Sequence, residues 1–449
     1  NNMNNNNENL EGNNVGSGVE DEHEHDVDYL SEADTEAYPE NYTDEEIAQY
    51  IDTDDIMERY FEDTGSLMAD GDMIDDDSLA MFLWFALNRL GHITHLDLSD
   101  SQFAQIGFYL LAYELSSFDS LISLDLSSNP LVPRDSVLEI SNAICLHPYL
   151  TSLSFADCDL QERVLALQDL LENTKILADL NICGNLISNE MASPLIKSIK
   201  SNKAAPLRNL DLGNNNLSGN FLLHSFFPYQ KSTGFLLDSL SISHNSFSQE
   251  SLELFIRGLY GNTTLTALDI MQNNITIDWT NLSVNLLNYD NLVRLDLSYN
   301  ILTNIGASAL SVYLKDCKAL RELSLNEIEP EEDGCKVISK ALLESDCIKK
   351  LSFTKNDVGE DELKELSNYI KATKNLTDLD LSANNLCQDS MYLLEKALLE
   401  NSSLRKLNLK HNQICNEDRD GLIALVKVVA KHNNLTSLNI GHNKIFHKQ

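Results

Sequence analysis

Apolar residues recur along most of this chain with a period of about 28 residues. Thirteen segments share one pattern, with apolar residues at the first, fourth and sixth positions and asparagine at the ninth in most copies. Because side chains on a strand point alternately to its two faces, positions four to six predict a short β-strand in each copy. The segments begin at Ile93, Leu121, Leu150, Leu177, Leu207, Leu237, Leu265, Leu292, Leu320, Ile348, Leu376, Leu404 and Leu435.

The residues that follow each predicted strand favour a helix. After the strand that begins near Leu292, apolar residues recur at helical spacing from Ile305 to Leu314. A period near 28 leaves room for a full helix after every strand. One strand–helix unit cannot bury its own leucines, so stacked copies must bury them in a continuous core.

Asparagine occupies the ninth position in ten of the thirteen copies. An amide at this point can bond backbone groups of the adjacent coil that would otherwise be buried without partners. Ser101, Cys158 and Ile328 depart from the pattern. The ten asparagines are Asn129, Asn185, Asn215, Asn245, Asn273, Asn300, Asn356, Asn384, Asn412 and Asn443.

This pattern resembles the ribonuclease-inhibitor-like class of leucine-rich repeat proteins. The resemblance implies an α/β horseshoe solenoid of about 13 repeats of ~28 residues, with a parallel β-sheet on the concave face and α-helices on the convex face. It covers about residues 79–449 and indicates the fold far more than the activity.

The composition divides the chain into four parts. Residues 1–19 are rich in Asn and Gly and are expected to be disordered. Residues 20–77 hold 24 acidic residues and one basic residue, a net charge of −23, and predict an acidic, largely disordered arm with one short helix as an alternative. Residues 78–92 predict a helix that caps the first repeat, and 93–449 predict the repeat domain. Because the chain begins with Asn rather than Met, we leave open whether it is a fragment.

The net charge of −38 argues against nucleic acid and anionic membranes as partners and favours basic proteins. No stretch approaches 18 apolar residues, so no membrane span is predicted. The eight cysteines are scattered, without a C-x-x-C pair or cysteine-rich caps. Reduced thiols in a cytoplasmic protein are therefore expected, with a nuclear or cytoskeleton-associated location as the alternative. The oligomeric state is left open.

The fifth position of each copy is expected to face the concave side. This position holds six aspartates and no basic residue, so the concave face is expected to be acidic. The aspartates either only keep the sheet surface hydrated or bind a basic protein surface. Lys350, Lys406 and Lys410 reverse the charge near the C-terminus. The predicted binding residues are Asp97, Asp125, Asn181, Asp211, Asp269, Asp296 and Asp380.

No catalytic motif, cofactor site or metal site is predicted from the sequence. Irregular loops follow the third and ninth strands, and loops on a rigid scaffold often carry function. The third loop, in LSFADCDLQERV, contains Arg163, and the second, in NPLVPRDS, contains Arg134. The third loop and residues 295–327 resemble the Ran GTPase-activating proteins, and Arg134 is a second candidate. The resemblance implies that a loop arginine, or an asparagine near the third repeat, stabilises the charge of phosphoryl transfer on a Ran-like small GTPase.

The sequence therefore predicts a non-enzymatic scaffold whose acidic concave face binds a basic protein partner. A GTPase activator that acts in trans is the first alternative. An adaptor in a cytoskeletal or ciliary assembly is the second.

Overall fold

A computed structural model describes most of the chain. The described residues are 42–71, 74–101, 104–129, 134–204, 206–226, 236–258, 263–277, 291–328, 330, 333–415 and 420–443. Residues 1–19, residues 20–41 and 72–73 of the predicted acidic arm, and the two acidic residues at 331–332 lie outside them. The chain divides into two compact units, residues 1–49 and 50–449.

The described part of the first unit, residues 42–49, contains one short helix, α1 (Asp44–Ile47). Thr43 caps it, since its Oγ1 accepts the backbone N–H of Glu46, while the Glu46 side chain accepts the backbone N–H of Thr43 at 2.8 Å. This arrangement is a capping box. The Thr43 backbone N–H and hydroxyl both donate to the Glu46 carboxylate and lower the pKa of Glu46.

The second unit is organised around one sheet of fifteen strands, which runs through the repeats in chain order. Every neighbouring pair from β2 to β19 is parallel, and each central leucine pairs with the central leucine of the next strand. The fifteen strands are β1 (Tyr60–Phe61), β2 (Ser66–Met68), β3 (His95–Asp97), β4 (Ser123–Asp125), β5 (Ser152–Ser154), β6 (Asp179–Asn181), β7 (Asn209–Asp211), β9 (Ser239–Ser241), β11 (Ala267–Asp269), β13 (Arg294–Asp296), β15 (Glu322–Ser324), β16 (Lys350–Ser352), β17 (Asp378–Asp380), β18 (Lys406–Asn408) and β19 (Ser437–Asn439).

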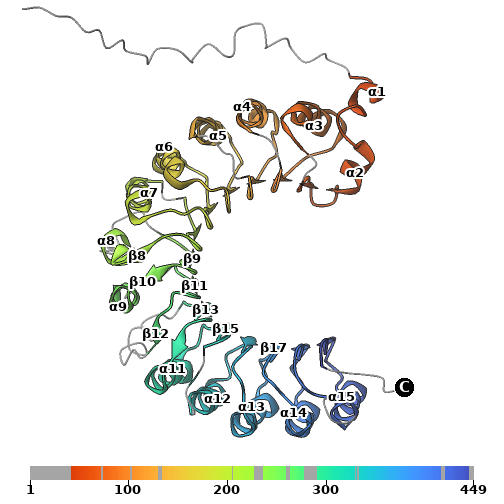
Figure 1. Cartoon of the computed structure of the whole chain (residues 1–449), viewed down its shortest axis with the longest axis vertical. Helices are drawn as coiled ribbons and strands as arrows, with labels where there is room; N and C mark the ends of the chain where they lie inside the picture. The colour runs from red at the N-terminus through yellow and green to blue at the C-terminus, as the bar shows by residue number, and fades with distance from the viewer. Residues whose placement is uncertain are drawn as a thin grey trace, which may run out of the picture. The chain divides into compact units, whose positions relative to one another are not determined.

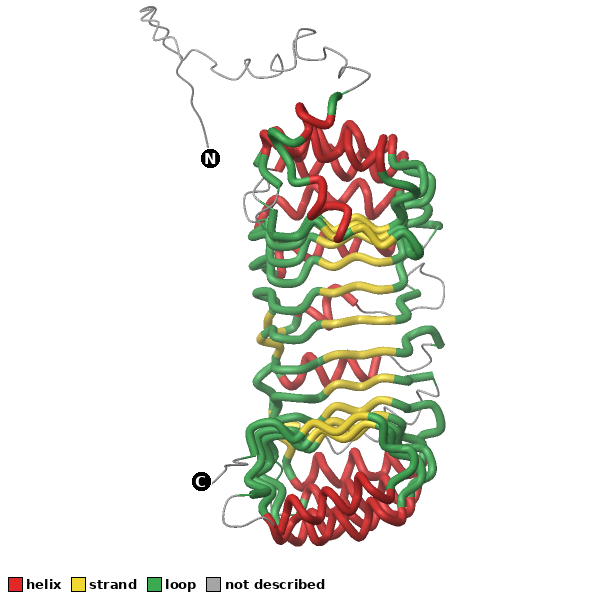
Figure 2. Tube along the Cα trace, turned by 90° about the vertical axis from the view of Figure 1, so that its right-hand side faces the viewer, coloured by secondary structure: helices red, strands yellow, loops and turns green. Residues whose placement is uncertain are grey.

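Helices follow the strands and lie along the outer side of the arc that this unit forms, while the strands line its inner side (Figure 1). Figure 2 shows the strands stacked like rungs, with the helices behind them. The helices are α2 (Thr53–Glu58), α3 (Asp76–Arg89), α4 (Gln105–Glu114), η1 (Leu115–Ser117), α5 (Arg134–Leu146), η2 (Gln161–Leu167), α6 (Gln168–Asn173), α7 (Asn189–Ser201), α8 (Phe221–Phe226), α9 (Gln249–Gly258), α11 (Asn304–Asp316), α12 (Gly334–Ser345), α13 (Glu360–Ala372), α14 (Gln388–Glu400) and α15 (Asp420–Lys431). Two small parallel sheets, β8 (Ser218–Gly219) with β10 (Ser246–Phe247) and β12 (Thr276–Ile277) with β14 (Ile301–Leu302), connect strands to helices in the middle of the array.

The leucines of the repeat form the core between sheet and helices. Leu96, Leu124 and Leu379 lie at the centres of their strands and are at most 2% exposed. Burial of such side chains stabilises a fold by about 1.5–3 kcal/mol each. The predicted α/β solenoid of leucine-rich repeats, with its long parallel sheet, is thus confirmed.

The N-terminal end differs from the expectation. The sheet does not begin at β3, because β2 pairs with it in parallel and β1 folds back antiparallel on β2. Helix α3 is thus the helix of an additional strand–helix unit rather than only a cap. It begins before residue 78, where the sequence placed its start, because Asp75 caps it by accepting the Ser78 N–H at 2.8 Å. A two-residue outer strand leaves little free edge for pairing with other chains.

The asparagine column forms the predicted ladder. The Nδ2 of Asn384 donates to the Phe353 carbonyl of the preceding coil at 2.7 Å, and its Oδ1 accepts the Asn356 N–H at 2.8 Å. Cys158 replaces one amide with a weaker donor, because its Sγ donates to the Leu126 carbonyl at 3.1 Å. Ile328 fills its position with a buried apolar side chain. The structural role expected for this column is confirmed.

Among the described residues, no helix combines the length and the apolar character needed to cross a bilayer.

Candidate protein-binding face

The inner face of the sheet carries two columns of side chains, because the residues on either side of each central leucine share one face. The first column, which precedes the leucine, is His95, Ser123, Ser152, Asp179, Asn209, Ser239, Ala267, Arg294, Glu322, Lys350, Asp378, Lys406 and Ser437. The second column, which follows it, is Asp97, Asp125, Ser154, Asn181, Asp211, Ser241, Asp269, Asp296, Ser324, Ser352, Asp380, Asn408 and Asn439. A shallow open trough runs over both columns from β4 to β15, and a second one continues to β19.

The aspartates of the second column have a structural role. The Oδ1 of Asp97 accepts the Ser99 backbone N–H at 2.9 Å, and Asp211 accepts that of Gly213 at 2.8 Å. The same hydrogen bond to the residue two positions later recurs for Asp125, Asp269, Asp296 and Asp380. Asn181, Asn408 and Asn439 make it with an amide oxygen instead. The oxygen, and not the charge, is therefore what the backbone requires.

Two pairs of aspartates lie directly opposite each other on neighbouring strands. Asp97 pairs in register with Asp125, and Asp269 with Asp296. Burial raises the pKa of Asp296, and the nearby Asp269 carboxylate raises it further, against the hydrogen bonds from Ser298. Like charges at such positions destabilise a sheet. The fold therefore keeps negative charge on this face at an energetic cost.

The C-terminal strands carry a different charge pattern, because cations of the first column alternate with acids. Glu322 lies between Lys350 at 2.7 Å and Arg294 at 3.8 Å. Lys406 pairs with Asp378 at 3.5 Å. These ion pairs are partly exposed, and each contributes about 0–1 kcal/mol. Together they neutralise most of the negative charge of this region.

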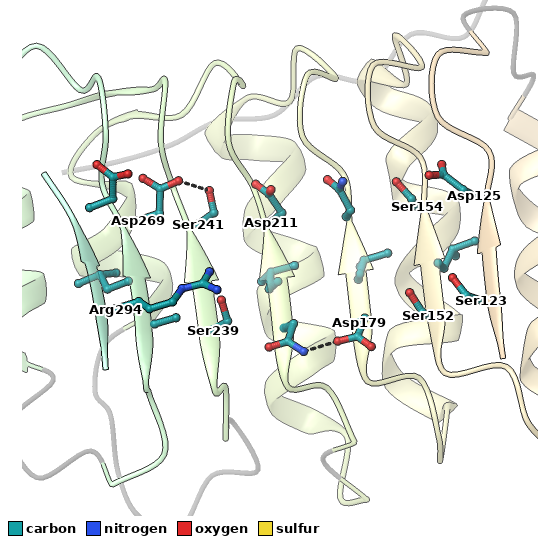
Figure 3. Close-up of a pocket in the computed structure, with 18 of the residues that line it drawn as sticks. Ser123, Asp125, Ser152, Ser154, Asp179, Asp211, Ser239, Ser241, Asp269 and Arg294 are labelled. Carbon is teal, nitrogen blue, oxygen red and sulfur yellow. Dashed lines mark hydrogen bonds between the residues drawn. The ribbon is translucent and has the colours of Figure 1, made fainter. Parts of the chain in front are cut away.

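The inner face thus has two halves. Strands β3 to β11, called here the acidic half, carry five carboxylates and no Lys or Arg in the two columns, a formal charge of −5. Strands β13 to β18, called the mixed half, carry four carboxylates and three cations, a formal charge of −1. Figure 3 shows Asp125, Asp211 and Asp269 in the row nearer the ends of their strands, and Asp179 and Arg294 in the other row.

The sequence placed seven candidate binding residues on this face, and all seven lie in the second column. Asp97, Asp125, Asn181, Asp211 and Asp269 belong to the acidic half, whereas Asp296 and Asp380 belong to the mixed half. Sequence reasoning missed Asp179, Arg294, Glu322 and Asp378. The period of two in a strand would have revealed them, since the residue before the central leucine faces the same way as the residue after it.

The two candidate arginines lie in the helical segments that follow β5 and β4. Arg163 lies in η2, where its Nε donates to the Leu160 carbonyl at 3.1 Å and its Nη2 to the Asp159 carbonyl. It also forms an ion pair with the Asp159 carboxylate at 3.7 Å. Arg134 is exposed at the first residue of α5. The Arg163 guanidinium is thus engaged by its own loop.

Metal ligation is a further possibility for an acidic surface. Within the ranges that the structure describes, no three His, Cys, Asp or Glu side chains converge in a way that could hold a metal ion.

Comparisons with known proteins agree with the repeat pattern. A family model described as Leucine Rich repeat matches residues 261–276, 291–311 and 400–425. No curated protein matches the chain at a significant level.

Solved structures with a similar course of the chain share 18% sequence identity with it. One is from the Rad7 and Elc1 complex in yeast, with 83% of each chain covered and a TM-score of 0.46. Another is an internalin, InlF, from Listeria monocytogenes, with 86% of this chain and 87% of that chain covered and a TM-score of 0.40. A third is LegL7 from Legionella pneumophila, with 71% and 82% covered and a TM-score of 0.36. Since the family model recognises the same strand–helix unit that stacks along the whole sheet, this chain is a leucine-rich repeat protein.

Proposed function

We propose that this chain is a non-enzymatic scaffold that binds a protein partner along the inner face of its sheet. The partner presents a segment rich in Lys and Arg to the acidic half. The observation that carries the proposal is the charge of that half, where seven successive strands hold five carboxylates and no Lys or Arg in the two inner columns.

The dimensions of the acidic half suit an extended or helical segment. Seven strands spaced about 4.8 Å apart span roughly 29 Å. This length corresponds to about nine residues of extended chain or about nineteen residues of helix. A partner of this size can contact several carboxylates at once, so charge contributes to specificity and to the rate of association.

The hydrogen bonds of the aspartates support a binding role beyond a structural one. Asparagine makes the same backbone contact at Asn181, Asn408 and Asn439, so the turn after the strand does not need a charge. The acidic half nevertheless keeps aspartate at Asp97 and Asp125, which lie in register on adjacent strands. A cationic partner relieves their mutual repulsion, since opposite charges attract across short distances.

The proposal is tested with a lysine-rich probe peptide in a series of salt concentrations. Binding should weaken steeply between low and physiological salt, because exposed charges are screened at distances near 8–10 Å. Binding that is insensitive to salt would count against the acidic half as the site. An adaptor in a cytoskeletal or ciliary assembly is one form of this scaffold role. Identifying the natural partner would decide whether the chain is such an adaptor.

The GTPase-activator alternative has less support. A catalytic arginine must reach the phosphates of a bound GTPase, whereas the Arg163 guanidinium donates to two carbonyls of its own loop. Arg134 is exposed, and its position after an early strand is the argument for it.

We further propose a reducing location such as the cytoplasm. All eight cysteines are thiols in this structure, including two whose sulfur atoms lie close together. Disulfides persist in oxidising compartments and are rare in the cytosol.

A further inference from the structure

Two cysteine thiols from successive coils lie next to each other. Cys317 follows the end of α11 and Cys347 follows the end of α12, and their Sγ atoms are 3.3 Å apart. Both residues are partly exposed. Figure 1 shows α11 and α12 side by side, which is the packing that brings the two thiols together. A small oxidant can therefore reach a pair that needs little movement to react.

The surroundings of the two sulfur atoms differ. The hydrogen bond with Cys317 lowers the pKa of Cys347, with smaller contributions from Ser345 and Arg321 that act against burial. The pKa of Cys317 is raised, first by its hydrogen bond with Cys347 and then by burial. Cys347 is thus the more acidic thiol of the pair and the one that supplies the thiolate. The thiolate is the reactive form of cysteine.

We propose that Cys317 and Cys347 form an oxidation-sensitive dithiol, which hydrogen peroxide converts into a disulfide between two coils of the solenoid. The sulfur atoms must approach by about 1.2 Å to reach the length of a disulfide bond. The proposal is independent of the function proposed for the inner face.

The reaction proceeds in two steps. The Cys347 thiolate attacks one oxygen of the peroxide, an S–O bond forms, the O–O bond breaks, and the released hydroxide takes a proton to become water. The Cys317 sulfur then attacks the sulfenic acid, the S–S bond forms, the S–O bond breaks, and the second hydroxide leaves as water with the proton of Cys317. Two thiols lose two electrons, and one peroxide is reduced to two waters.

The disulfide would join residues that are 30 positions apart. The two cysteines precede β15 and β16, whose first residues Glu322 and Lys350 form an ion pair on the inner face. A Cys317–Cys347 disulfide would keep the coils of β15 and β16 linked when this region unfolds. Oxidation should therefore raise the temperature at which this region unfolds, because the cross-link restricts the unfolded chain.

Cys387 provides a matched control. Cys387 is exposed at the start of α14, and its pKa is lowered mainly by a backbone hydrogen bond at Ser390. Its Sγ lies 3.7 Å from the Ser390 hydroxyl. Because its Sγ contacts a hydroxyl rather than a thiol, Cys387 should form no internal disulfide and should stay available for alkylation under limiting peroxide.

The experiment uses the full chain, reduced and then freed of reductant. After treatment with hydrogen peroxide, the protein is unfolded, its thiols are alkylated with iodoacetamide, and the intact mass is measured. The reduced chain has eight thiols, and we expect six alkylated thiols after oxidation, that is, eight minus the two of the pair. A peptide that links Cys317 to Cys347 should appear in the digest, and dithiothreitol should restore all eight thiols.

Three variants decide the assignment. Cys317→Ser and Cys347→Ser should each abolish the linked peptide, whereas Cys387→Ser should retain it. The rate for the unchanged chain should fall as the pH is lowered, because protonation removes the thiolate of Cys347. A chain that keeps eight thiols under peroxide, or that oxidises at Cys347 without forming the link, would overturn the proposal. Melting curves of the reduced variants check that each is folded.

Discussion

The carboxylates of Asp269 and Asp296 occupy directly paired positions on the adjacent strands β11 and β13. Neither forms an ion pair with a cation in the described part of the chain, although Arg294 lies on the same strand as Asp296 and pairs with Glu322 instead. Each uses one oxygen to accept a backbone N–H, from Met271 and Ser298 respectively, at 2.9 Å. Structure and charge can therefore be separated at these positions by substitution.

The first prediction concerns Asp296. Asp296→Asn should keep the hydrogen bond to Ser298 and remove the repulsion by Asp269, which stabilises the chain by about 0.2–1 kcal/mol. Asp296→Ala removes the acceptor as well and should destabilise it by about 1 kcal/mol relative to the Asn variant. Urea denaturation of both variants measures the difference. Equal midpoints for the two variants would show that the backbone contact has no energetic value.

The raised pKa of Asp296 also predicts a dependence on pH. Because the folded state binds the proton more tightly than the unfolded state, Asp296 favours folding below its unfolded pKa of about 3.9. This contribution is lost as pH rises from there through the raised folded pKa. The difference in stability between the native chain and Asp296→Asn should therefore be smaller at acidic pH than at pH 7. A difference that grows as the pH falls would contradict the assigned direction.

The second prediction concerns the asparagine ladder. Asn384→Ala leaves the Phe353 carbonyl and the Asn356 N–H without their partners in a buried site, at a cost of about 1–3 kcal/mol for each unpaired group. Asn384→Cys should cost less, because Cys158 shows that a thiol can donate to the carbonyl at this position. Hydrogen exchange at the Asn356 amide reports the loss locally. If both variants exchange equally fast, the thiol does not replace the amide.

The third prediction concerns Gly306, in the first turn of α11. A Cβ atom at this residue would lie 1.8 Å from the Ile277 carbonyl oxygen, so the helix would have to move away from the neighbouring coil. Gly306→Ala should destabilise the chain by about 1–3 kcal/mol. Ser308→Ala, on the exposed side of the same helix, is the control and should stay within about 0.5 kcal/mol. Thermal melting of both variants compares them directly.

The fourth prediction concerns the arginines. Single-turnover GTP hydrolysis by a Ran-like GTPase should proceed at its intrinsic rate with this chain and with its Arg163→Ala and Arg134→Ala variants. The reason is that the Arg163 guanidinium is held by Leu160 and Asp159 of its own loop. A large acceleration that is lost in either variant would establish the activator function and name its residue.

The repeat unit could be predicted from the sequence because its leucines and asparagines are local signals with a fixed period. The additional unit at β2 escaped this pattern. A further copy would start at Thr64, 29 residues before Ile93. Leu67 and Ile74 match its pattern, but threonine replaces the first apolar residue, the small Ala69 replaces a large apolar residue, and Asp72 replaces the asparagine. The structure shows that Leu67 and Ala69 are nevertheless buried. Pairing with β3 therefore compensates for the weak local signal.

The candidate site was only partly predictable. The second column followed from strand alternation, but the ion pairs around Glu322 depend on which long side chains reach across strands. The environment of Arg163 depends on an irregular loop with positive φ at Gln161. The positive φ at Asp157 and Asp159 recurs in other copies, whereas that at Gln161 does not. Cys317 and Cys347 do not occupy equivalent positions of their repeats. Cys317 precedes the repeat start Leu320 by three residues, whereas Cys347 precedes the repeat start Ile348 by one residue, so the repeat pattern does not predict their contact.

The measurement that tests the central claim most directly compares two variants with the same change in net charge. One combines Asp97→Asn, Asp125→Asn, Asp211→Asn and Asp269→Asn, which keeps the backbone acceptors of the acidic half. The other combines Glu139→Gln, Glu172→Gln, Glu250→Gln and Asp361→Asn on exposed positions of the outer helices. Both are titrated with the lysine-rich peptide at low salt.

The account predicts that the inner variant loses most of its affinity, about tenfold or more, while the outer variant binds nearly as the native chain does, since screening weakens the more distant charges. Equal losses in the two variants would show that the peptide responds to the total charge of the protein, and they would contradict the assignment of the acidic half as the binding face.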